Sequence, residues 1–268
     1  MRKKVKLLIL LLAIVSGTGS LFAQSDSDGA SSPFSVSADL SSRYIWRGLN
    51  LGGSSPSIQP GIEYGFGSEN HSFAIGAWGA YSLSGTQQGQ EADLFLSYTF
   101  KELLSITVTD YYFPDEAVGV HDYFNYNGGQ TGHLLEAAIG FAGTEKIPFS
   151  VMFAMNVWGD DSQKYEEQSG AMVITDGIVM SKYLELGYSA DFKGVAMDLF
   201  AGVCLDSPKV HLGEPTGFYR QQSAGLINLG MTLSKEVKIT ESYSLPIFGS
   251  IITNPEAGNI FLVVGVSF

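Results

Sequence analysis

Residues 91–112 read EADLFLSYTFKELLSITVTDYY, and apolar side chains occupy every second position of this stretch. The apolar series runs through Ala92, Leu94, Leu96, Tyr98 and Phe100, and resumes at Leu104, Ile106, Val108 and Tyr112. The alternate positions are mainly polar. Because successive side chains of a β-strand point to opposite faces, this period predicts two strands, each with one apolar and one polar face. The link of residues 101–103 between them is short enough for a tight turn.

The same alternation recurs along most of the chain and predicts twelve strands. They cover residues 35–47, 57–66, 72–83, 91–100, 104–112, 133–141, 149–158, 183–192, 195–205, 225–234, 237–252 and 259–268. Two residues fit this scheme poorly. Asp110 falls on the apolar parity of its strand, and Glu241 falls on the apolar parity of the irregular eleventh strand, where a bulge would restore the phase.

The connections between these strands alternate in length. Every second one is short, as at residues 101–103, 193–194 and 235–236, and the longest ones are polar, at residues 113–132, 159–182 and 206–224. Short turns at one end and long loops at the other are typical of outer-membrane barrels. We therefore predict an all-β fold, a transmembrane antiparallel up-and-down β-barrel of about twelve strands. A secreted soluble β protein is the alternative.

The N-terminus has the pattern of a secretory signal peptide. Four basic residues, Arg2, Lys3, Lys4 and Lys6, precede an apolar run at residues 7–15 and a region rich in small residues that ends at Ala23. We expect residues 1–23 to be a signal peptide, residues 24–33 a flexible lead-in, and residues 34–268 the barrel. No later run of 18 apolar residues follows, which excludes a helical membrane protein.

The composition narrows the class of partners. The net charge is −12, and removing residues 1–23 takes away four positive charges and leaves −16. An acidic chain argues against nucleic-acid binding. The single cysteine, Cys204, excludes an internal disulfide, and His, Cys and acidic residues show no metal-site spacing. We expect no cofactor and no metal.

Aromatic residues near the predicted strand ends lie on the apolar parity. Tyr44, Trp46, Tyr81, Tyr98, Phe100, Tyr112, Phe192 and Phe268 form this set. Amphipathic rings prefer the membrane–water interface, so this distribution favours the barrel.

Residues 37–66, SADLSSRYIWRGLNLGGSSPSIQPGIEYGF, carry a family resemblance. The Ser42-Arg43-Tyr44 run, the Arg47-Gly48 pair and the stretch Pro56-Ser57-Ile58-Gln59-Pro60-Gly61 resemble the TorF-like porin family of bacterial outer membranes. Residues 74–80, 91–94 and 110–114 extend the likeness. The resemblance implies an outer-membrane β-barrel with an uncharacterised transport role, and it brings no catalytic residues.

The last strand ends in alternating apolar residues and a terminal aromatic ring. Ile260, Leu262, Val264, Val266 and Phe268 look like the signal by which the barrel-assembly machinery recognises its clients. Recognition would use main-chain pairing along an exposed strand edge. A plain closing strand is the alternative.

The polar faces of the strands would point into the barrel lumen. The candidate pore-lining residues are Arg43, Arg47, Glu63, Glu91, Asp93, Glu136, Glu185 and Asp198, and they are mostly acidic. One interpretation is a narrow, water-filled channel that prefers cations. The other is a plugged barrel in which both arginines pair with carboxylates, because unpaired buried charge is costly.

These observations predict a porin-like channel in the bacterial outer membrane for passive passage of small solutes or ions. The alternative is a plugged structural barrel, or one that binds ligands or adheres through its outer loops. Residues 121–132 would suit sugar or peptide contacts, and residues 160–168 could hold divalent cations beside lipopolysaccharide. Expected partners are outer-membrane lipid, lipopolysaccharide, the assembly machinery and the solute. No G-x-S-x-G motif occurs and the histidines are scattered, so we expect no enzyme and exposed polar histidines.

Overall fold

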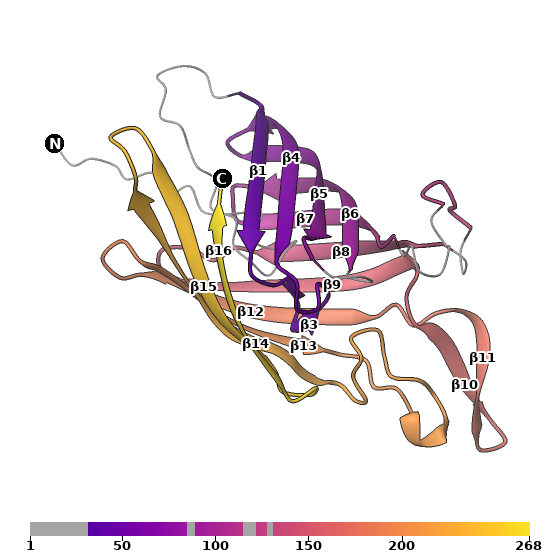
Figure 1. Ribbon diagram of the computed structural model, residues 1–268. Coiled ribbons are helices and arrows are strands. Elements are labelled where there is room, and N and C mark those ends of the chain that lie inside the picture. The colour runs from indigo at the N-terminus through magenta and orange to yellow at the C-terminus, as the bar shows by residue number, and fades with distance from the viewer. Residues whose placement is uncertain (1–31, 85–88, 115–121, 128–130) are drawn as a thin grey trace.

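A computed structural model describes residues 32–84, 89–114, 122–127 and 131–268. They form a closed barrel of twelve antiparallel strands (Figure 1). In chain order these are β1 (Phe34–Ser41), β4 (Ser57–Ser68), β5 (His71–Ser82), β6 (Gln90–Phe100), β7 (Leu104–Tyr112), β8 (His133–Phe141), β9 (Phe149–Gly159), β12 (Lys182–Asp191), β13 (Ala196–Cys204), β14 (Gly225–Lys238), β15 (Ser244–Asn254) and β16 (Asn259–Ser267). Each strand pairs with the next, and β1 closes the ring on β16 through residues 39–41.

Two hairpins and one short helix are not part of the ring of strands. One hairpin joins β2 (Ile45–Trp46) to β3 (Leu49–Asn50), and the other joins β10 (Gln163–Gln168) to β11 (Ala171–Ile178). Figure 1 shows the β10–β11 hairpin extending beyond the barrel. A single 3₁₀ turn, η1 (Val210–Leu212), is the only helical element in the described residues. None of the described helical structure is long and apolar enough to cross a membrane.

The apolar series of each strand faces outward, as the alternation predicts. Exposed fractions reach 77% for Val36, 54% for Ile75, 54% for Leu96 and 73% for Ile260. In the last strand, Leu262, Val264 and Phe268 are exposed on the same face as Ile260. The lumen faces carry mainly polar and small residues, together with several aromatic rings. A barrel that is apolar outside and polar inside is the arrangement of transmembrane β-barrels.

The strand connections alternate in length, as predicted. The strands are connected at one end by residues 69–70, 101–103, 142–148, 192–195 and 239–243, and at the other end by residues 42–56, 83–89, 113–132, 160–181, 205–224 and 255–258, which include the four longest connections. All long loops leave one end of the barrel, which we call the outer end.

The predicted turn at residues 235–236 is wrong, because Lys235 and Glu236 pair with β15 as part of β14. The turn between β14 and β15 lies within the predicted eleventh strand, which explains the irregular phase of residues 237–252 without a bulge. Glu241 lies in this turn and is 98% exposed.

The predicted first strand, residues 35–47, is wrong beyond Ser41. The chain turns inward at residues 42–44, so Tyr44 and Trp46 lie inside the barrel, 4% and 3% exposed, and not at a membrane interface. The apolar parity of Val36, Ala38 and Leu40 happens to extend to Tyr44 and Trp46, and this extension produced the incorrect strand boundary. The predicted signal peptide, and all but the last two residues of the lead-in, lie outside the described residues.

Three phenylalanine rings point into the lumen, each over a glycine on the neighbouring strand. Phe95 pairs with Gly76, Phe200 with Gly230, and Phe248 with Gly265. A Cβ added to Gly76 would lie 2.4 Å from Cζ of Phe95 and 2.6 Å from the carbonyl oxygen of Ile62. The glycines provide the space that the rings fill.

Replacing Gly76 by alanine is therefore expected to destabilise the barrel by about 1–3 kcal/mol, the usual cost of overpacking. Thermal unfolding in detergent, read from the shift between compact and unfolded bands on electrophoresis, measures this change. Gly249→Ala is the matched control, because a Cβ there meets its nearest atoms only at 3.9 Å. Equal melting temperatures for the two variants would contradict the packing role of Gly76.

Candidate functional site

The first long connection, residues 42–56, folds back into the barrel. Its centre is the inner hairpin, residues 45–50, in which β2 pairs with β3. Arg47 and Gly48 have φ values of 48° and 76°, which suit a two-residue type I′ turn. Ile45, Trp46, Arg47 and Leu49 are between 2% and 7% exposed. The inner hairpin is therefore a buried element of the lumen.

Arg47 fastens the inner hairpin to the barrel wall. Its Nη2 lies 2.9 Å from Oε1 of Glu136 on β8, and its Nη1 lies 2.5 Å from Oε2 of the same carboxylate. Nη1 also donates to the Tyr219 hydroxyl at 3.0 Å. The guanidinium carbon lies 4.5 Å from the ring centres of both Trp46 and Tyr183. This bidentate pair, flanked by two aromatic faces, satisfies a charge that burial would otherwise penalise.

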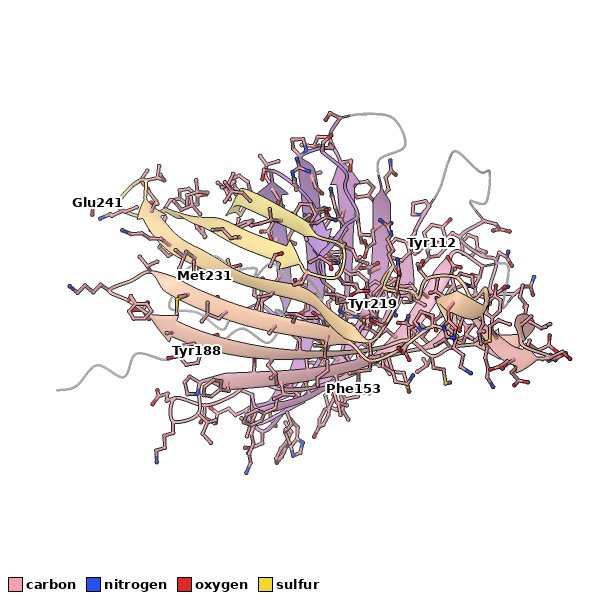
Figure 2. All side chains as sticks on the ribbon, turned by 90° about the horizontal axis from the view of Figure 1, so that it is seen from below. Tyr112, Phe153, Tyr188, Tyr219, Met231 and Glu241 are labelled. Carbon is pink, nitrogen blue, oxygen red and sulfur yellow. The ribbon has the colours of Figure 1, made fainter. Side chains whose placement is uncertain are left out.

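Aromatic rings complete the packing around the inner hairpin. The Trp46 ring centre lies 5.7 Å from that of Tyr111, 5.9 Å from Tyr219 and 6.3 Å from Phe218. Phe218 and Tyr219 come from the loop between β13 and β14, and Tyr219 is 1% exposed. Figure 2 shows Tyr219 and Glu241 toward opposite ends of the barrel. Two inward-folded loops thus meet and fill the lumen near its outer end.

The turn of the inner hairpin fits closely against β14. A Cβ on Gly48 would lie 1.9 Å from the carbonyl oxygen of Ile227, and Nδ2 of Asn254 donates to the Gly48 carbonyl at 3.3 Å. Ile227 sits where the β13–β14 register shifts, and it is fully buried. Within the predicted strand of residues 225–234, Ile227 shares its parity with the outward-facing Leu229 and Leu233, but the register shift turns it inward.

A second group of lumen residues, on β4 and β6, is acidic. Tyr44 donates to Oε2 of Glu91 at 2.7 Å. Asp93 is 2% exposed, and neither of its carboxylate oxygens makes a hydrogen bond of normal geometry within the described residues. The same is true of Glu63 Oε2. Ser57 Oγ and Gln59 Nε2 also have no such partner. We call these residues, together with the neighbouring Glu91, the polar wall: Ser57, Gln59, Glu63, Glu91 and Asp93.

The other predicted pore-lining residues have local partners. Glu185 accepts from the Tyr183 hydroxyl and from Nδ2 of Asn228, and Asp198 accepts from the Ser189 hydroxyl at 2.6 Å. Arg43 lies beyond the end of β1 and donates to the Gly53 carbonyl at 3.2 Å. The structure thus joins Arg47 to Glu136 and places Glu91 near Asp93. Within the described residues it brings no carboxylate to Arg43.

Sequence reasoning missed the tyrosines of the site. Tyr111 donates to Oε1 of Glu136 at 3.2 Å, and Tyr44, Tyr183 and Tyr219 contact the other charged groups as described above. Tyr111 and Tyr183 share the lumen parity of their strands, so the alternation could have found them. Tyr219 lies in a long loop, where the alternation carries no information.

A separate cluster lies on the outside of the barrel near the outer end. His133 is fully buried beneath residues 122–127, with Nδ1 2.9 Å from Oδ1 of Asp110 and Nε2 2.6 Å from the Tyr123 carbonyl oxygen. The Tyr126 ring stacks on the imidazole at 4.2 Å, and its hydroxyl donates to Asp110. Burial, followed by the Asp110 carboxylate, raises the pKa of Tyr126 to about 12, so its hydroxyl keeps the proton that it donates.

The expectation that His133 is exposed is therefore wrong. The cluster also explains why a charged residue, Asp110, occurs on the outward-facing side of its strand: it pairs with His133. Both imidazole nitrogens face acceptors, so neither is free to act as a base. The cluster is a clasp that holds residues 122–127 against the barrel wall.

Asp110→Asn is expected to loosen that clasp by about 1–3 kcal/mol, the range for a hydrogen bond to a charged group. Hydrogen–deuterium exchange at residues 122–127 should accelerate, while exchange in β7 stays slow. His71→Ala is the control, since His71 also contacts a tyrosine hydroxyl, that of Tyr98, but at the other end of the barrel. Unchanged exchange in Asp110→Asn would show that the clasp does not hold the segment.

The described residues contain no group of three or more His, Cys, Asp or Glu side chains that could hold a metal ion. In the acidic stretch of residues 160–168, Asp161 accepts from Nδ2 of Asn156 and from the Ser181 amide. These bonds give Asp161 a structural role in closing the base of its loop.

Comparison with known proteins gives one family and several distant structures. A family model described as a bacterial protein of unknown function (Gcw_chp) matches residues 27–203, well over half of the chain. No curated protein matches the sequence.

Solved barrels of low similarity were also found. The translocator domain of the autotransporter NalP from Neisseria meningitidis is 12% identical, with a TM-score of 0.35 and 90% of each chain covered. The β domain of the Bordetella autotransporter BrkA is 11% identical, with a TM-score of 0.35, covering 88% of this chain and 98% of that one. A chain from a study of in-meso crystallization of membrane proteins is 10% identical, with a TM-score of 0.45, covering 87% and 81%. The description of the fold rests on the strand pairing of this chain itself.

Proposed function

The chain belongs to the Gcw_chp family of bacterial proteins of unknown function, and we propose that it is a narrow outer-membrane channel that prefers cations and is held closed by its inner hairpin. The outward apolar faces support a place in the membrane, because such faces need a hydrocarbon solvent. The resemblance of residues 37–66 to TorF-like porins supports a transport role.

The polar wall is the observation that carries the proposal. Buried polar groups are normally hydrogen-bonded to protein or to water. Gln59 Nε2 and Glu63 Oε2 lack protein partners among the described residues, and the Asp93 carboxylate has only the Glu91 side chain and the Tyr112 backbone amide beside it. A polar site of this kind is suited to buried water. We therefore infer a hydrated path along β4 and β6, beside the inner hairpin.

Charge along this path favours cations. Glu63, Glu91 and Asp93 belong to the polar wall, whereas the nearest lumen arginine, Arg47, is already neutralised by Glu136. A ring or row of carboxylates attracts cations and repels anions, as in cation-selective channels. The lumen of a twelve-stranded barrel is wider than that of packed eight-stranded barrels and narrower than that of open porins with 16 to 18 strands. The path is therefore narrow even when the inner hairpin moves.

Ion-substitution recordings in planar bilayers test this function. The purified processed chain should give a small conductance whose reversal potential in a potassium chloride gradient has the sign of potassium. Replacing potassium with a bulky organic cation should lower the current. An anion-selective current, or silence of both the wild type and a variant that lacks the Arg47 side chain in membranes where a known porin conducts, would contradict the channel.

We further propose that the protein is exported to the bacterial outer membrane, contacts lipid and lipopolysaccharide there, and is recognised by the barrel-assembly machinery through its C-terminal strand. Its passive role requires no catalytic residue and no cofactor. Fractionation tests the location, since a chain that stays dissolved without detergent as a compact particle would be inconsistent with it.

A plugged barrel that binds ligands through its outer loops is the second candidate. The observation that favours it is the dense packing of Trp46, Arg47 and Tyr219 inside the lumen. Silence in the bilayer recordings, combined with ligand binding at the outer end, would support this candidate.

A further inference from the structure

A cavity of about 350 Å³ lies between the bases of the two longest outer loops. We call it the outer cavity. Its lining residues are Ser162, Gln163, Tyr165, Val179, Ser181, Asp206, Ser207, Pro208, Glu214, Pro215, Thr216 and Gly217. This volume is at the lower end of the range for small-molecule sites, roughly 300–1,000 Å³. A ligand of one or two sugar rings is therefore the appropriate size class.

The walls of the outer cavity are fixed by contacts between the loops. Asp206 accepts from the Lys182 amide and from Lys182 Nζ at 2.7 Å. Lys209 Nζ lies 3.3 Å from Oε2 of Glu167 on β10, which joins the second loop to the projecting hairpin. The Val179 amide donates to the Ser162 carbonyl at 2.9 Å and closes the base of that hairpin. The cavity is therefore bounded by tied segments, and a ligand would meet a largely preformed site.

The chemistry of the lining selects the ligand. Hydroxyl groups come from Ser162, Ser207, Thr216 and Tyr165, and carboxylates come from Asp206 and Glu214. Hydroxyls both donate and accept, and carboxylates accept strongly, which matches a ligand that carries many hydroxyl groups. The rest of the lining includes flat apolar surfaces, which come from the ring of Tyr165 and from Pro208 and Pro215. Such surfaces suit the C–H faces of a sugar ring.

Charge excludes two other ligand classes. No lysine or arginine side chain lines the outer cavity among the described residues, so an anion would meet carboxylates without compensation. The Asp206 carboxylate is already paired with Lys182, and Glu214 accepts from the Lys209 amide at 2.6 Å. Glu214 is therefore the one lining carboxylate without a cationic partner among the described residues, and the lining carries too few free carboxylates to coordinate a cation. We propose that the outer cavity binds a neutral saccharide.

The same loop connects the outer cavity to the inner hairpin. Gly217 lines the cavity, and its amide donates to the Gln221 carbonyl at 2.9 Å. Residues 217–221 thus form one tight turn, and Tyr219 within it contacts Arg47 and Trp46. A sugar that displaces this turn would alter the surroundings of Trp46. Saccharide binding does not depend on the proposed channel function. Only an effect of that binding on conductance would depend on it.

Calorimetry and tryptophan fluorescence on the full processed chain in detergent test the proposal. The probes are glucose, galactose and maltose, with gluconate and glucosamine as charged comparisons. At least one neutral sugar should bind saturably and change the emission, and the charged sugars should bind more weakly. Absence of saturable binding by every neutral sugar, or preference for gluconate or glucosamine, would overturn the neutral-saccharide site.

Two variants locate the binding. Glu214→Gln keeps an oxygen for the Lys209 amide but removes the charged acceptor, and Thr216→Val removes an exposed hydroxyl at nearly constant volume. We expect affinity to fall about tenfold or more for Glu214→Gln and about fivefold for Thr216→Val, the changes that follow from losing charged and neutral hydrogen bonds. Ser242→Ala, in the short turn at the other end of the barrel, is the control. Wild-type affinity in both cavity variants would overturn the assignment, and because binding is measured without ion flow, a failed channel would not affect this result.

Discussion

Arg47→Ala should open the barrel. The variant removes the bidentate contact to Glu136 and the contact to Tyr219, so the inner hairpin loses its charged anchor to the wall. Breaking one partner of a buried ion pair costs about 3–5 kcal/mol, because the other charge is left uncompensated. That difference shifts the ratio of closed to open states by roughly a hundredfold or more. We expect larger and longer openings in single-channel recordings.

Arg43→Ala is the matched control for this experiment. Arg43 is four residues away in the same connection, but its guanidinium donates only to the Gly53 carbonyl, which a water molecule can replace. Its conductance should therefore remain that of the wild type. The double variant Arg47→Ala/Glu136→Gln should recover much of the lost stability, since no unpaired charge remains, and yet stay open. A folded Arg47→Ala protein with wild-type conductance would show that the inner hairpin does not close the path.

The barrel was predictable because one physical rule acts on every strand. Hydrocarbon outside and a polar lumen inside impose a period of two, and Leu94, Leu96, Ile106 and Val108 follow it. Loop lengths add an independent signal, since β-strands that run up and down the membrane place all long connections at one end. The strand count and the outward faces are therefore confirmed by the structure.

The inner hairpin was not predictable from the same rule. Tyr44 and Trp46 continue the apolar parity of β1, although the chain has left the barrel wall there and Trp46 belongs to a second pair of strands inside the barrel. The available signal was Gly48 alone, because a glycine suits the second position of a type I′ turn, whereas Arg47 is not one of the residues that favour the first position. The resemblance to TorF-like porins included the Arg47-Gly48 pair, but a resemblance does not state what the backbone does there.

The partners of charged residues were predictable in type but not in identity. Burial requires that Arg47 be paired, and the sequence offered several lumen carboxylates. The choice of Glu136 depends on the distance between an inward loop and β8, which are 89 residues apart in the chain. The exposure of Ile227 and of His133 could not be predicted for a related reason. A register shift turns Ile227 inward, and residues 122–127 cover His133.

Neutralising the polar wall should abolish cation preference. In Glu91→Gln/Asp93→Asn, the shapes of the side chains are kept while two buried carboxylates are removed. The ratio of potassium to chloride permeability should fall from well above one to about one, since selectivity by a row of carboxylates depends on their charge. The reversal potential in a salt gradient, measured on the Arg47→Ala background to give a large current, should move toward zero.

Glu185→Gln and Asp198→Asn are the controls that separate position from net charge. Both remove a lumen carboxylate, but Glu185 is bound by Tyr183 and Asn228, and Asp198 by Ser189. Glu185 and Asp198 lie apart from the polar wall, each with local hydrogen-bond donors, whereas Glu91 and Asp93 lie beside each other and form its acidic pair. The two controls should thus retain most of the cation preference. If all variants lost the same share of the cation preference, selectivity would depend on the total charge of the lumen. That result would contradict the proposed path along β4 and β6.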